Sequence, residues 1–409
     1  LAEFNPVNGA PQAGGIPGLR FVPGGFAGDA NSSTVLFSSQ REVAGGYNVR
    51  EAFFEFGIPL LDNGKLNLNE AFRWADYSGS GQAQAWKSGV SYQATPKFRI
   101  RATLSQDVRA PTLRERFESQ RGGVNVVDPA NGNATISTAS FDGGNPNVGL
   151  ETAETSVLGF VYQPLDKLSV TIDRYDIDLD GAIGRLTAQT EVNTCYASAG
   201  HNTSSLCQFV IRDPATTQIT RVETLFINLA NQRVRGTDLE LNFSGIDLGQ
   251  GSLGWRFLAS RLDENSILTP GTPRDERAGD VGTSGLPKTK ITTSLNYARG
   301  PVSLFLQERY VGGGVNDRTL VESATRIPGV TTIDENSVSS VTYTDVTFSY
   351  SGGNSGRTPW QAFFTVNNLT NEEPPDMYPV VGRAGVPGPN TFLYDTIGRR
   401  YTAGVRVNF

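Results

Sequence analysis

Side chains that could carry chemistry are sparse in this sequence. Its only histidine, His201, lies in a polar segment between Cys195 and Cys207. A Ser–His or Cys–His hydrolase would need that imidazole as its general base. A single histidine in a polar loop is more typical of a solvated side chain than of a catalytic one. We therefore expect no catalytic residue and no enzymatic activity.

The two cysteines lie close together, without a CxxC motif or a further Cys/His cluster, which argues against a zinc site. We expect Cys195 and Cys207 to form a disulfide, which is typical of an oxidising compartment. Two free thiols are the alternative. Closing so short a loop stabilises a fold by about 3 kcal/mol in the chain-entropy model.

The acidic stretch at 176–181, with sequence DIDLDG, is similar to the opening of a calcium-binding loop. Such a loop needs a bidentate glutamate at its twelfth position, which is Thr187 here. The alternative is a strand with its aspartates on one side and Ile177 and Leu179 on the other. We favour the strand and expect no metal site.

Two arginines, Arg109 and Arg114, could contact an anionic ligand or could pair with nearby carboxylates, and we favour pairing. No P-loop or dinucleotide fingerprint follows a strand and opens a helix. We therefore expect no cofactor.

The composition narrows the class of protein. The chain has 409 residues, 46 of them glycine, and its hydrophobic fraction is only 38%. No uncharged apolar run approaches the roughly 18–20 residues that a membrane helix needs. A membrane β-barrel stays possible, because its lipid-facing residues alternate with polar ones. The net charge of −6 argues against a nucleic-acid partner.

Alternation of apolar and polar residues with a period of two is the dominant pattern, and it is typical of strands with one apolar face. The final segment is an example, since Tyr401, Val405 and Phe409 share a face while Arg406 lies on the other. The pattern predicts thirteen strands, at 52–58, 66–74, 86–92, 98–104, 158–162, 168–172, 239–243, 253–257, 291–297, 302–310, 346–350, 360–366 and 401–409.

The connections between these segments alternate between short and long. Short ones lie near 59–65, 94–97, 163–167, 245–252, 299–302 and 351–359, and long ones near 76–85, 107–151, 180–231, 262–288, 312–339 and 368–399. A soluble sandwich has no reason to collect every long loop at one end. An outer-membrane barrel does, because short turns face the periplasm and long loops face outside. We predict an all-β, transmembrane, antiparallel up-and-down β-barrel.

Aromatic residues follow the same division and predict a girdle at each membrane interface. Those beside the short turns are Tyr92, Phe98, Tyr162, Trp255, Tyr297, Tyr350, Trp360 and Phe409, and those beside the long loops are Trp74, Trp86, Tyr310 and Tyr401. One strand changes its apolar face, from Leu168 and Ile172 to Ile177 and Leu179. A β-bulge near Asp173 and Arg174 would explain the change. It would turn the aspartates of 176–180 toward the lumen and Ile177 and Leu179 toward lipid.

The strand count has a consequence for domain organisation. Bacterial single-chain barrels normally have an even number of strands, so we expect at least one more strand upstream. Residues 34–43 could supply it and complete a fourteen-stranded barrel, but their alternation is poor, so we favour a longer protein of which this is a part. Residues 1–46, rich in Gly, Pro, Asn and Ser, are expected to be a loop or poorly ordered lead-in, and residues 47–409 the barrel. The chain begins at Leu1 without a signal peptide, which favours processing or a fragment.

Five stretches, in this order and spacing, resemble motifs of TonB-dependent outer-membrane receptors. They are 105–117 (SQDVRAPTLRERF), 145–154 (NPNVGLETAE), 231–241 (with RGTDLE at 235–240), 366–371 (VNNLTN, with Thr370 in place of the usual aromatic) and 397–401 (IGRRY). The resemblance covers about residues 45–409. It implies a 22-stranded barrel filled by an N-terminal plug, with uptake of a scarce nutrient energised through TonB. The plug, the TonB-contacting segment and about nine strands are not in this chain.

The resemblance implies a receptor in the Gram-negative outer membrane for a ferric siderophore, vitamin, glycan or peptide. Its ligand would bind the long loops 107–151, 180–231, 262–288, 312–339 and 368–399. Expected partners are outer-membrane lipid and lipopolysaccharide, TonB through the plug, and the barrel assembly machinery, since Phe409 resembles the C-terminal aromatic that this machinery recognises. A passive porin-like channel is the alternative, and an outer-membrane enzyme or adhesin is a third possibility.

Overall fold

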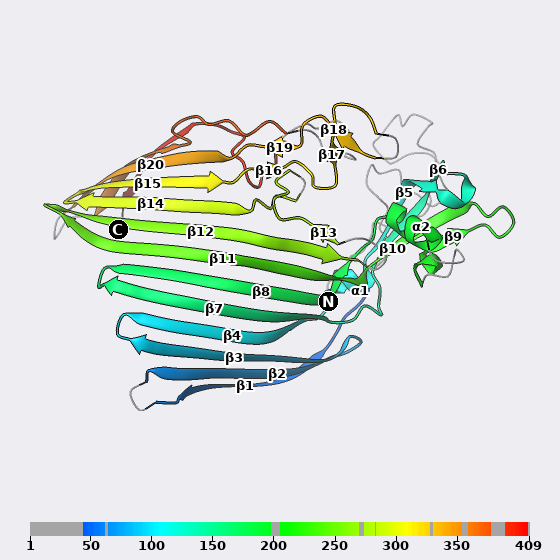
Figure 1. Ribbon diagram of the computed structural model, residues 1–409, viewed down its shortest axis with the longest axis horizontal. Helices are drawn as coiled ribbons and strands as arrows, with labels where there is room; N and C mark the ends of the chain where they lie inside the picture. The colour runs from blue at the N-terminus through cyan, green and yellow to red at the C-terminus, as the bar shows by residue number, and fades with distance from the viewer. Residues whose placement is uncertain are drawn as a thin grey trace.

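The computed structural model describes residues 44–61, 64–197, 205–269, 274–282, 284–327, 330–353, 359–377 and 389–407. Thirteen long strands form one curved antiparallel sheet in which neighbours along the chain pair with one another (Figure 1). This confirms the predicted number of strands and the all-β class. The sheet is a partial barrel, since β1 and β22, at its two ends, each pair with a single described strand.

The strands of the barrel sheet are β1 (Val49–Pro59), β2 (Leu66–Tyr77), β3 (Gly81–Thr95), β4 (Phe98–Arg109), β7 (Glu151–Leu165), β8 (Leu168–Gly184), β11 (Ile227–Leu248), β12 (Gly251–Leu268), β14 (Thr289–Arg299), β15 (Val302–Val311), β20 (Val341–Gly352), β21 (Trp360–Asn367) and β22 (Arg400–Val407). The two-residue strand β13 (Asp275–Glu276) pairs with the end of β12. Within the described residues, no helix is long and apolar enough to span a membrane.

The pairing register sorts the side chains of the sheet into two faces of different chemistry. One face is apolar along its middle and exposes large hydrophobic residues, among them Leu104, Leu158, Tyr162, Phe348, Phe364, Tyr401 and Val405. The opposite face carries polar and charged residues such as Arg101, Asp173, Asn242, Gln307 and Arg406. An outer-membrane barrel turns its apolar face to lipid and its polar face to the lumen.

The aromatic residues predicted beside the short turns lie on the apolar face. Phe98 packs edge-on against Tyr162, and Tyr350 packs against Trp360 on a neighbouring strand. Such pairs contribute about 0.5–1.5 kcal/mol beyond the area they bury. Phe409 lies outside the described residues.

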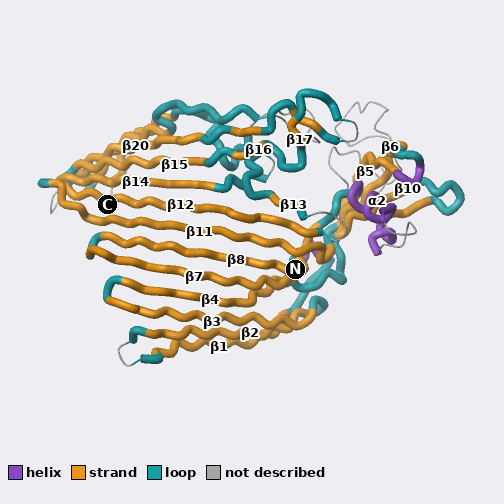
Figure 2. Tube along the Cα trace, viewed as in Figure 1, coloured by secondary structure: helices purple, strands orange, loops and turns teal. Residues whose placement is uncertain are grey.

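The two ends of the sheet differ as predicted, with one correction. The short connections β1–β2, β3–β4, β7–β8, β11–β12, β14–β15 and β20–β21 share one end, and the long ones share the other (Figure 2). The connection predicted as a long loop at 76–85 is wrong. Strands β2 and β3 stay paired as far as Tyr77 and Gly81 and are joined by a tight turn. Gly79 and Gly81 adopt positive φ there, which favours a tight turn over a loop.

The predicted bulge near Asp173 and Arg174 is also wrong. Strand β8 pairs without interruption through both residues, with β7 on one side and β11 on the other. Register shifts lie elsewhere, among them one in β8 at Asp180 and Gly181 opposite β11, and one in β12, where Asp263 is the extra residue opposite Arg235 and Gly236 of β11. Asp263 forms an ion pair with Arg174. In β8 the same face therefore carries Ile172 and, nearer the loop end, the charged Arg174, Asp176 and Asp178.

This correction reverses the predicted orientation of the acidic stretch. Asp176 and Asp178 share a face with Leu158 and Ile172, whereas Ile177 and Leu179 lie on the lumenal face. Asp176 pairs with Arg233 and Arg235 of β11. The stretch belongs to strand β8, as favoured over a calcium loop, with a register shift against β11 at Asp180 and Gly181. Thr187, its twelfth position, caps the next helix by accepting a hydrogen bond from the Thr190 N–H at 3.2 Å.

A small folded unit, here called the cap, stands beyond the loop end of the sheet (Figure 1). It combines two loops. The first, after β4, supplies β5 (Ser119–Asp128), a 3₁₀ turn η2 (Pro129–Asn131) and β6 (Ala134–Gly143). The second, after β8, supplies α2 (Ala188–Ala197), a 3₁₀ turn η3 (Ser205–Phe209), β9 (Val210–Arg212) and β10 (Ile219–Leu225). Parallel pairing of β6 with β10 joins the two loops into one four-stranded sheet.

The cap has a hydrophobic core of its own. Ala188, Val192 and Cys195 are spaced to share one face of α2 and pack with Val126, Val210, Ile219 and Val222 of the cap sheet. Burying these side chains is what holds two loops of distant sequence together.

Several predictions fall on residues outside the described ranges. They are residues 1–43 of the lead-in predicted at 1–46, the possible extra strand at 34–43, His201 and Phe409.

Candidate functional site

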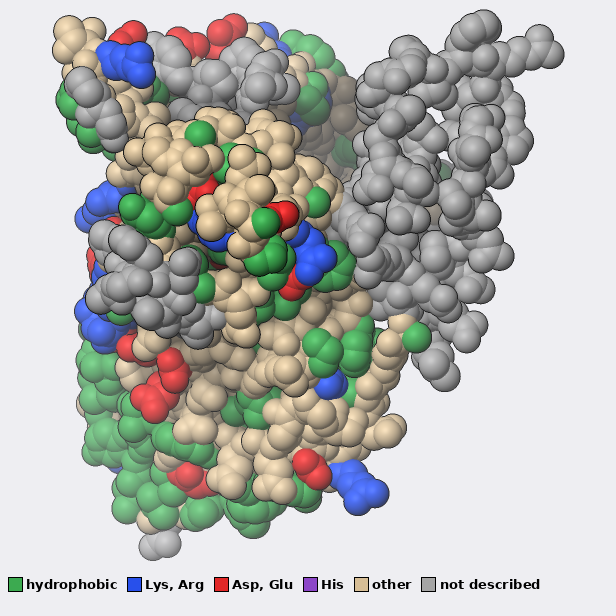
Figure 3. Space-filling view, turned by 90° about the vertical axis from the view of Figure 1, so that its right-hand side faces the viewer, with side chains coloured by type: hydrophobic (Ala, Val, Ile, Leu, Met, Phe, Trp, Pro, Cys, Tyr) green, Lys and Arg blue, Asp and Glu red, His purple; other side chains and the backbone are tan. Residues whose placement is uncertain are grey.

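Four structured regions lie at the loop end of the barrel sheet: the cap, a junction at its base, an ion-paired segment after β12, and a pocket between β21 and β22. All five long loops predicted to bind ligand contribute to them. The third begins at 269 rather than 262, since β12 continues to Leu268. Figure 3 views this end directly and shows acidic and basic side chains intermixed rather than gathered into one patch.

The junction below the cap is built from two of the motif stretches noted above. Arg109, at the end of β4, forms ion pairs with Glu151 at the start of β7 and with Glu115, 2.9 Å away. Glu151 also accepts a hydrogen bond from the Ile183 N–H of β8 at 2.5 Å. One buried carboxylate thus connects the ends of three strands.

The short helix α1 (Leu113–Phe117) completes this junction. Thr112 and Glu115 form a capping box, in which each side chain accepts a hydrogen bond from the other residue's backbone N–H. The other predicted arginine, Arg114, pairs with Glu118 at 3.1 Å and is largely exposed. Both arginines are therefore paired with carboxylates, the alternative that the sequence favoured.

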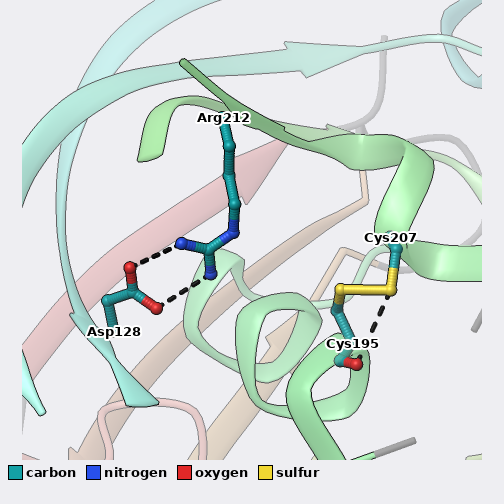
Figure 4. Close-up of a disulfide and its surroundings, with 4 residues drawn as sticks. All are labelled: Asp128, Cys195, Cys207 and Arg212. Atoms are coloured by element: carbon teal, nitrogen blue, oxygen red, sulfur yellow. Dashed lines mark hydrogen bonds and ion pairs between the residues drawn. A yellow bond between two sulfur atoms is a disulfide. The ribbon is translucent and has the colours of Figure 1, made fainter. Parts of the chain in front are cut away.

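Two side-chain links, a disulfide and an ion pair, connect elements of the cap (Figure 4). Cys195 of α2 and Cys207 of η3 form the predicted disulfide. Arg212 of β9 donates two hydrogen bonds, at 2.7 and 2.8 Å, to the fully buried carboxylate of Asp128. The guanidinium of Arg212 lowers the pKa of Asp128. A buried bidentate pair of this kind fixes geometry more than it adds net stability.

One buried acid in the cap lies beside other acids. Glu191 of α2 is 1% exposed, and its Oε2 atom has no hydrogen-bond partner among the described residues. Burial, together with the nearby carboxylates of Asp142 and Glu223, raises the pKa of Glu191 to about 8. Glu191 is therefore mostly protonated at neutral pH. The helical spacing of α2 would have indicated the buried face, but Asp142 comes from the other loop and Glu223 from a distant strand of the same loop.

The segment between β12 and β14 is anchored by Arg277. Its guanidinium pairs with Asp275 at 2.6 Å and with Asp280 at 3.0 Å. Hydrogen bonds to these two carboxylates raise the pKa of Arg277, against the opposing effect of burial. Asn336, from the loop between β15 and β20, donates from its side chain to the Asp317 carbonyl at 2.9 Å. These contacts give two further loops a defined structure.

Described residues at both ends of the connection between β21 and β22 line a pocket of about 520 Å³. Its walls join the two remaining motif stretches. The Asn371 side chain accepts a hydrogen bond from the Arg399 N–H at 3.0 Å. The Asp395 side chain accepts hydrogen bonds from the N–H groups of Ile397 and Gly398. It also forms an ion pair with Arg400. These motifs thus form the corner from which β22 starts.

The arrangement offers groups suited to binding. Among the described residues, no group of three or more His, Cys, Asp or Glu side chains is placed to hold a metal ion. The lumenal face and the loop end offer polar and charged groups on a rigid scaffold, which suits the capture of a polar solute.

The curved sheet, its apolar outer band and its structured loops define the chain as part of an outer-membrane β-barrel. The sequence profile of the family described as "TonB dependent receptor-like, beta-barrel" matches residues 10–369. The chain belongs to this family and is thus located in the Gram-negative outer membrane. No curated protein matched the sequence.

Solved structures agree on the fold. A double mutant of the ferric enterobactin receptor PfeA from Pseudomonas aeruginosa is 18% identical with a TM-score of 0.59, over 88% of this chain and 45% of its own. The siderophore receptor PirA from Acinetobacter baumannii is 15% identical with a TM-score of 0.60, over 89% and 46%. The outer membrane transporter YddB from Escherichia coli is 10% identical with a TM-score of 0.57, over 88% and 45%. The chain thus spans less than half of each of these proteins.

Proposed function

We propose that this chain is the C-terminal barrel portion of a receptor that takes up a scarce nutrient through the outer membrane with energy relayed by TonB. Membership of the TonB-dependent receptor family carries this proposal. The polar lumenal face and the structured loops are consistent with capture of a solute at the loop end. Residues 47–409 would form the barrel portion, and 1–46 the segment leading into it.

A ferric siderophore is the substrate class we favour among siderophores, vitamins, glycans and peptides. The support comes from the similar structures, which include a ferric enterobactin receptor and a siderophore receptor. One PfeA variant has been solved with enterobactin. These structures are less than 20% identical to this chain and share its fold. That this chain takes a ferric siderophore is our proposal.

The ligand would be held by the loops at 107–151, 180–231, 262–288, 312–339 and 368–399. TonB would act through a plug outside this chain. The exposed apolar band would contact lipid, and the charged residues above it lipopolysaccharide. Phe409 would serve the barrel assembly machinery. Like other transporters of its family, the protein would carry out no chemical conversion.

A planar-bilayer recording on the purified full-length receptor tests active uptake against the porin-like alternative. A receptor whose lumen is filled by a plug is expected to show no steady conductance. A large, stable open pore in the unmodified protein would contradict the proposal and favour a passive channel.

A further inference from the structure

Apolar side chains adjoin one another at one place on the lumenal wall, toward the loop ends of β7, β8, β11 and β12. Ile177 of β8 is paired directly with Val234 of β11, and Leu179 follows Ile177 on the same face. The residues that meet there are here called the wall patch: Val157, Tyr175, Ile177, Leu179, Val234 and Leu262. All six are half-buried, and neither of the two hydrophobic clusters in the described chain contains any of them.

Tyr175 adds an aromatic surface to the wall patch. Its side chain lies across Gly236 of β11, because a Cβ atom at that position would overlap the Tyr175 hydroxyl. Tyr175 and Leu262 are the pairing partners of Gly236 on its two sides. The absence of a side chain on Gly236 therefore lets the tyrosine reach from β8 toward β12 and makes the patch continuous over three strands.

Elsewhere on the lumenal face, apolar side chains stand among polar ones. Val161, nearer the short turns, is paired with Arg99 on one side and Thr171 on the other. Phe305 of β15 also has a polar partner on either side. Single apolar residues of this kind are ordinary, whereas a contiguous apolar surface marks a place where something binds.

The level of the wall patch points to the class of partner. The same stretches of β8 and β11 carry charged residues on their outer face, namely Asp176, Asp178, Arg233 and Arg235. Charged side chains are costly against hydrocarbon, so this part of the wall rises above the lipid. It lies at the loop end of the sheet, below the cap (Figure 1). A solute that enters from the loop end meets this wall before it reaches the membrane-spanning part of the lumen.

The chemistry of the wall patch suits part of a small molecule. Ligand sites combine a mostly apolar lining with a few polar groups that fix orientation. Gln232, the partner of Leu179 on β11, offers an amide at the edge of the patch. We propose that the wall patch binds an apolar group, aromatic or aliphatic, of the solute captured at the loop end. This rests on the proposed uptake function and narrows its ligand to an amphipathic metal chelate.

Calorimetry on the purified full-length receptor in detergent, with empty micelles as the blank, tests the proposal with uncharged ferric tris-hydroxamates. The acetohydroxamate complex carries methyl groups, the cyclohexanecarbohydroxamate complex aliphatic rings and the benzohydroxamate complex aromatic rings. Both ring-bearing complexes are expected to bind at least about tenfold more tightly than the methyl complex, because a ring buries more apolar area. A preference for the aromatic rings indicates contact with Tyr175, and its absence indicates contact with the aliphatic side chains. Both results support the proposal.

Val234→Thr should weaken binding of the ring-bearing complexes about threefold, because it puts a hydroxyl into the apolar contact and keeps the β-branched shape. The double variant I177T/V234T should weaken it about tenfold. Binding of the acetohydroxamate complex should stay unchanged in both. The matched control is Val161→Thr, the same change on the lumenal wall outside the patch, and it should leave all affinities unchanged.

Equal affinity for all the complexes, no binding of the ring-bearing ones, or an equal loss in Val161→Thr would overturn the proposal. Maleimide labelling of Val234→Cys in the ligand-free receptor is a further check. Failure to label it would show that another part of the receptor covers the patch, which also contradicts the proposal. Because binding is measured without uptake, its failure is separate from a failure of the transport proposal, which the bilayer recording decides.

Discussion

Arg101 and Asp173 form an ion pair across an intervening strand. Arg101 lies on β4 and Asp173 on β8, and Gly159 of β7 is paired with both. The Nη2 atom of Arg101 is 2.6 Å from Oδ2 of Asp173, and its Nε atom is 3.1 Å from Oδ1. The two side chains meet directly over the glycine, on the lumenal face. Glycine is required here for space, since a Cβ atom would overlap Asp173 Oδ1 and lie 2.7 Å from Arg101 Nε.

Replacing Gly159 with alanine should therefore separate this ion pair. Because Arg101 is about half exposed, we expect a loss in the free energy of unfolding of only about 1 kcal/mol. Urea unfolding of the receptor in micelles measures it. In an R101A/D173A background, the same substitution should cost much less, and an equal loss in both backgrounds would show that the glycine serves another purpose.

Glu151→Gln should destabilise the junction at the base of the cap. The substitution removes the charge of a buried carboxylate whose partner, Arg109, is 45% exposed, so we expect a loss of about 1–2 kcal/mol. Arg114→Gln is the matched control, because Arg114 is 71% exposed and its pair with Glu118 should contribute about 0.5 kcal/mol or less. Thermal unfolding of the two variants, followed by the change in gel mobility, measures the loss of stability in each. Equal losses in Glu151→Gln and Arg114→Gln would refute this role for Glu151.

Removing the disulfide by C195S/C207S should open the cap as one unit. We expect a loss of about 3 kcal/mol in cap stability, since the bond closes a short loop over a small core. Limited proteolysis should then cut within 119–143 and within 188–225 at similar rates, while the barrel sheet stays resistant. Cleavage confined to the second region would show that the two loops are independent.

Cap stability should fall as the pH rises from about 4.5 to 8. Glu191 has a pKa of about 8 when folded, against 4.5 ordinarily. In this window the unfolded chain has released the proton that the folded cap retains, so a higher pH favours unfolding, by a total on the order of 5 kcal/mol. Above pH 8 this contribution should stay constant.

Hydrogen-exchange mass spectrometry of α2, corrected for the intrinsic exchange rate, measures this dependence. Glu191→Gln should remove it, because the amide cannot ionise, whereas Glu223→Gln should only reduce it. An unchanged pH profile in Glu191→Gln would place the titration elsewhere.

The barrel could be predicted from sequence because the pattern that identifies each strand lies within the strand itself. Each strand carries its own alternation, so all thirteen were found, together with most of the connections. The failures are also physical. The bulge was placed at Asp173 because Ile177 and Leu179 are apolar, but these side chains face the lumen, and the irregularity at Asp263 depends on pairing with β11.

The cap could not be predicted in the same way. Its sheet depends on parallel pairing of Asp142 with Thr224, which no local pattern encodes. The disulfide was predictable, because two cysteines leave one pairing. The pocket was not, since Asn371 and Arg399 meet only through the folded loop. The motif resemblance indicated the stretches 105–117, 145–154, 366–371 and 397–401. It did not show that the first two form the junction below the cap or that the last two form the corner before β22.

The central claim, energised uptake by the full-length receptor, is tested most directly by accumulation of radioactive iron from ferric siderophores. Cells that express the receptor as their sole siderophore receptor would be compared with matched cells lacking functional TonB. We expect saturable accumulation of at least one ferric siderophore in the first strain and background levels in the second. Equal, non-saturable accumulation in both strains would contradict the account and identify a passive channel.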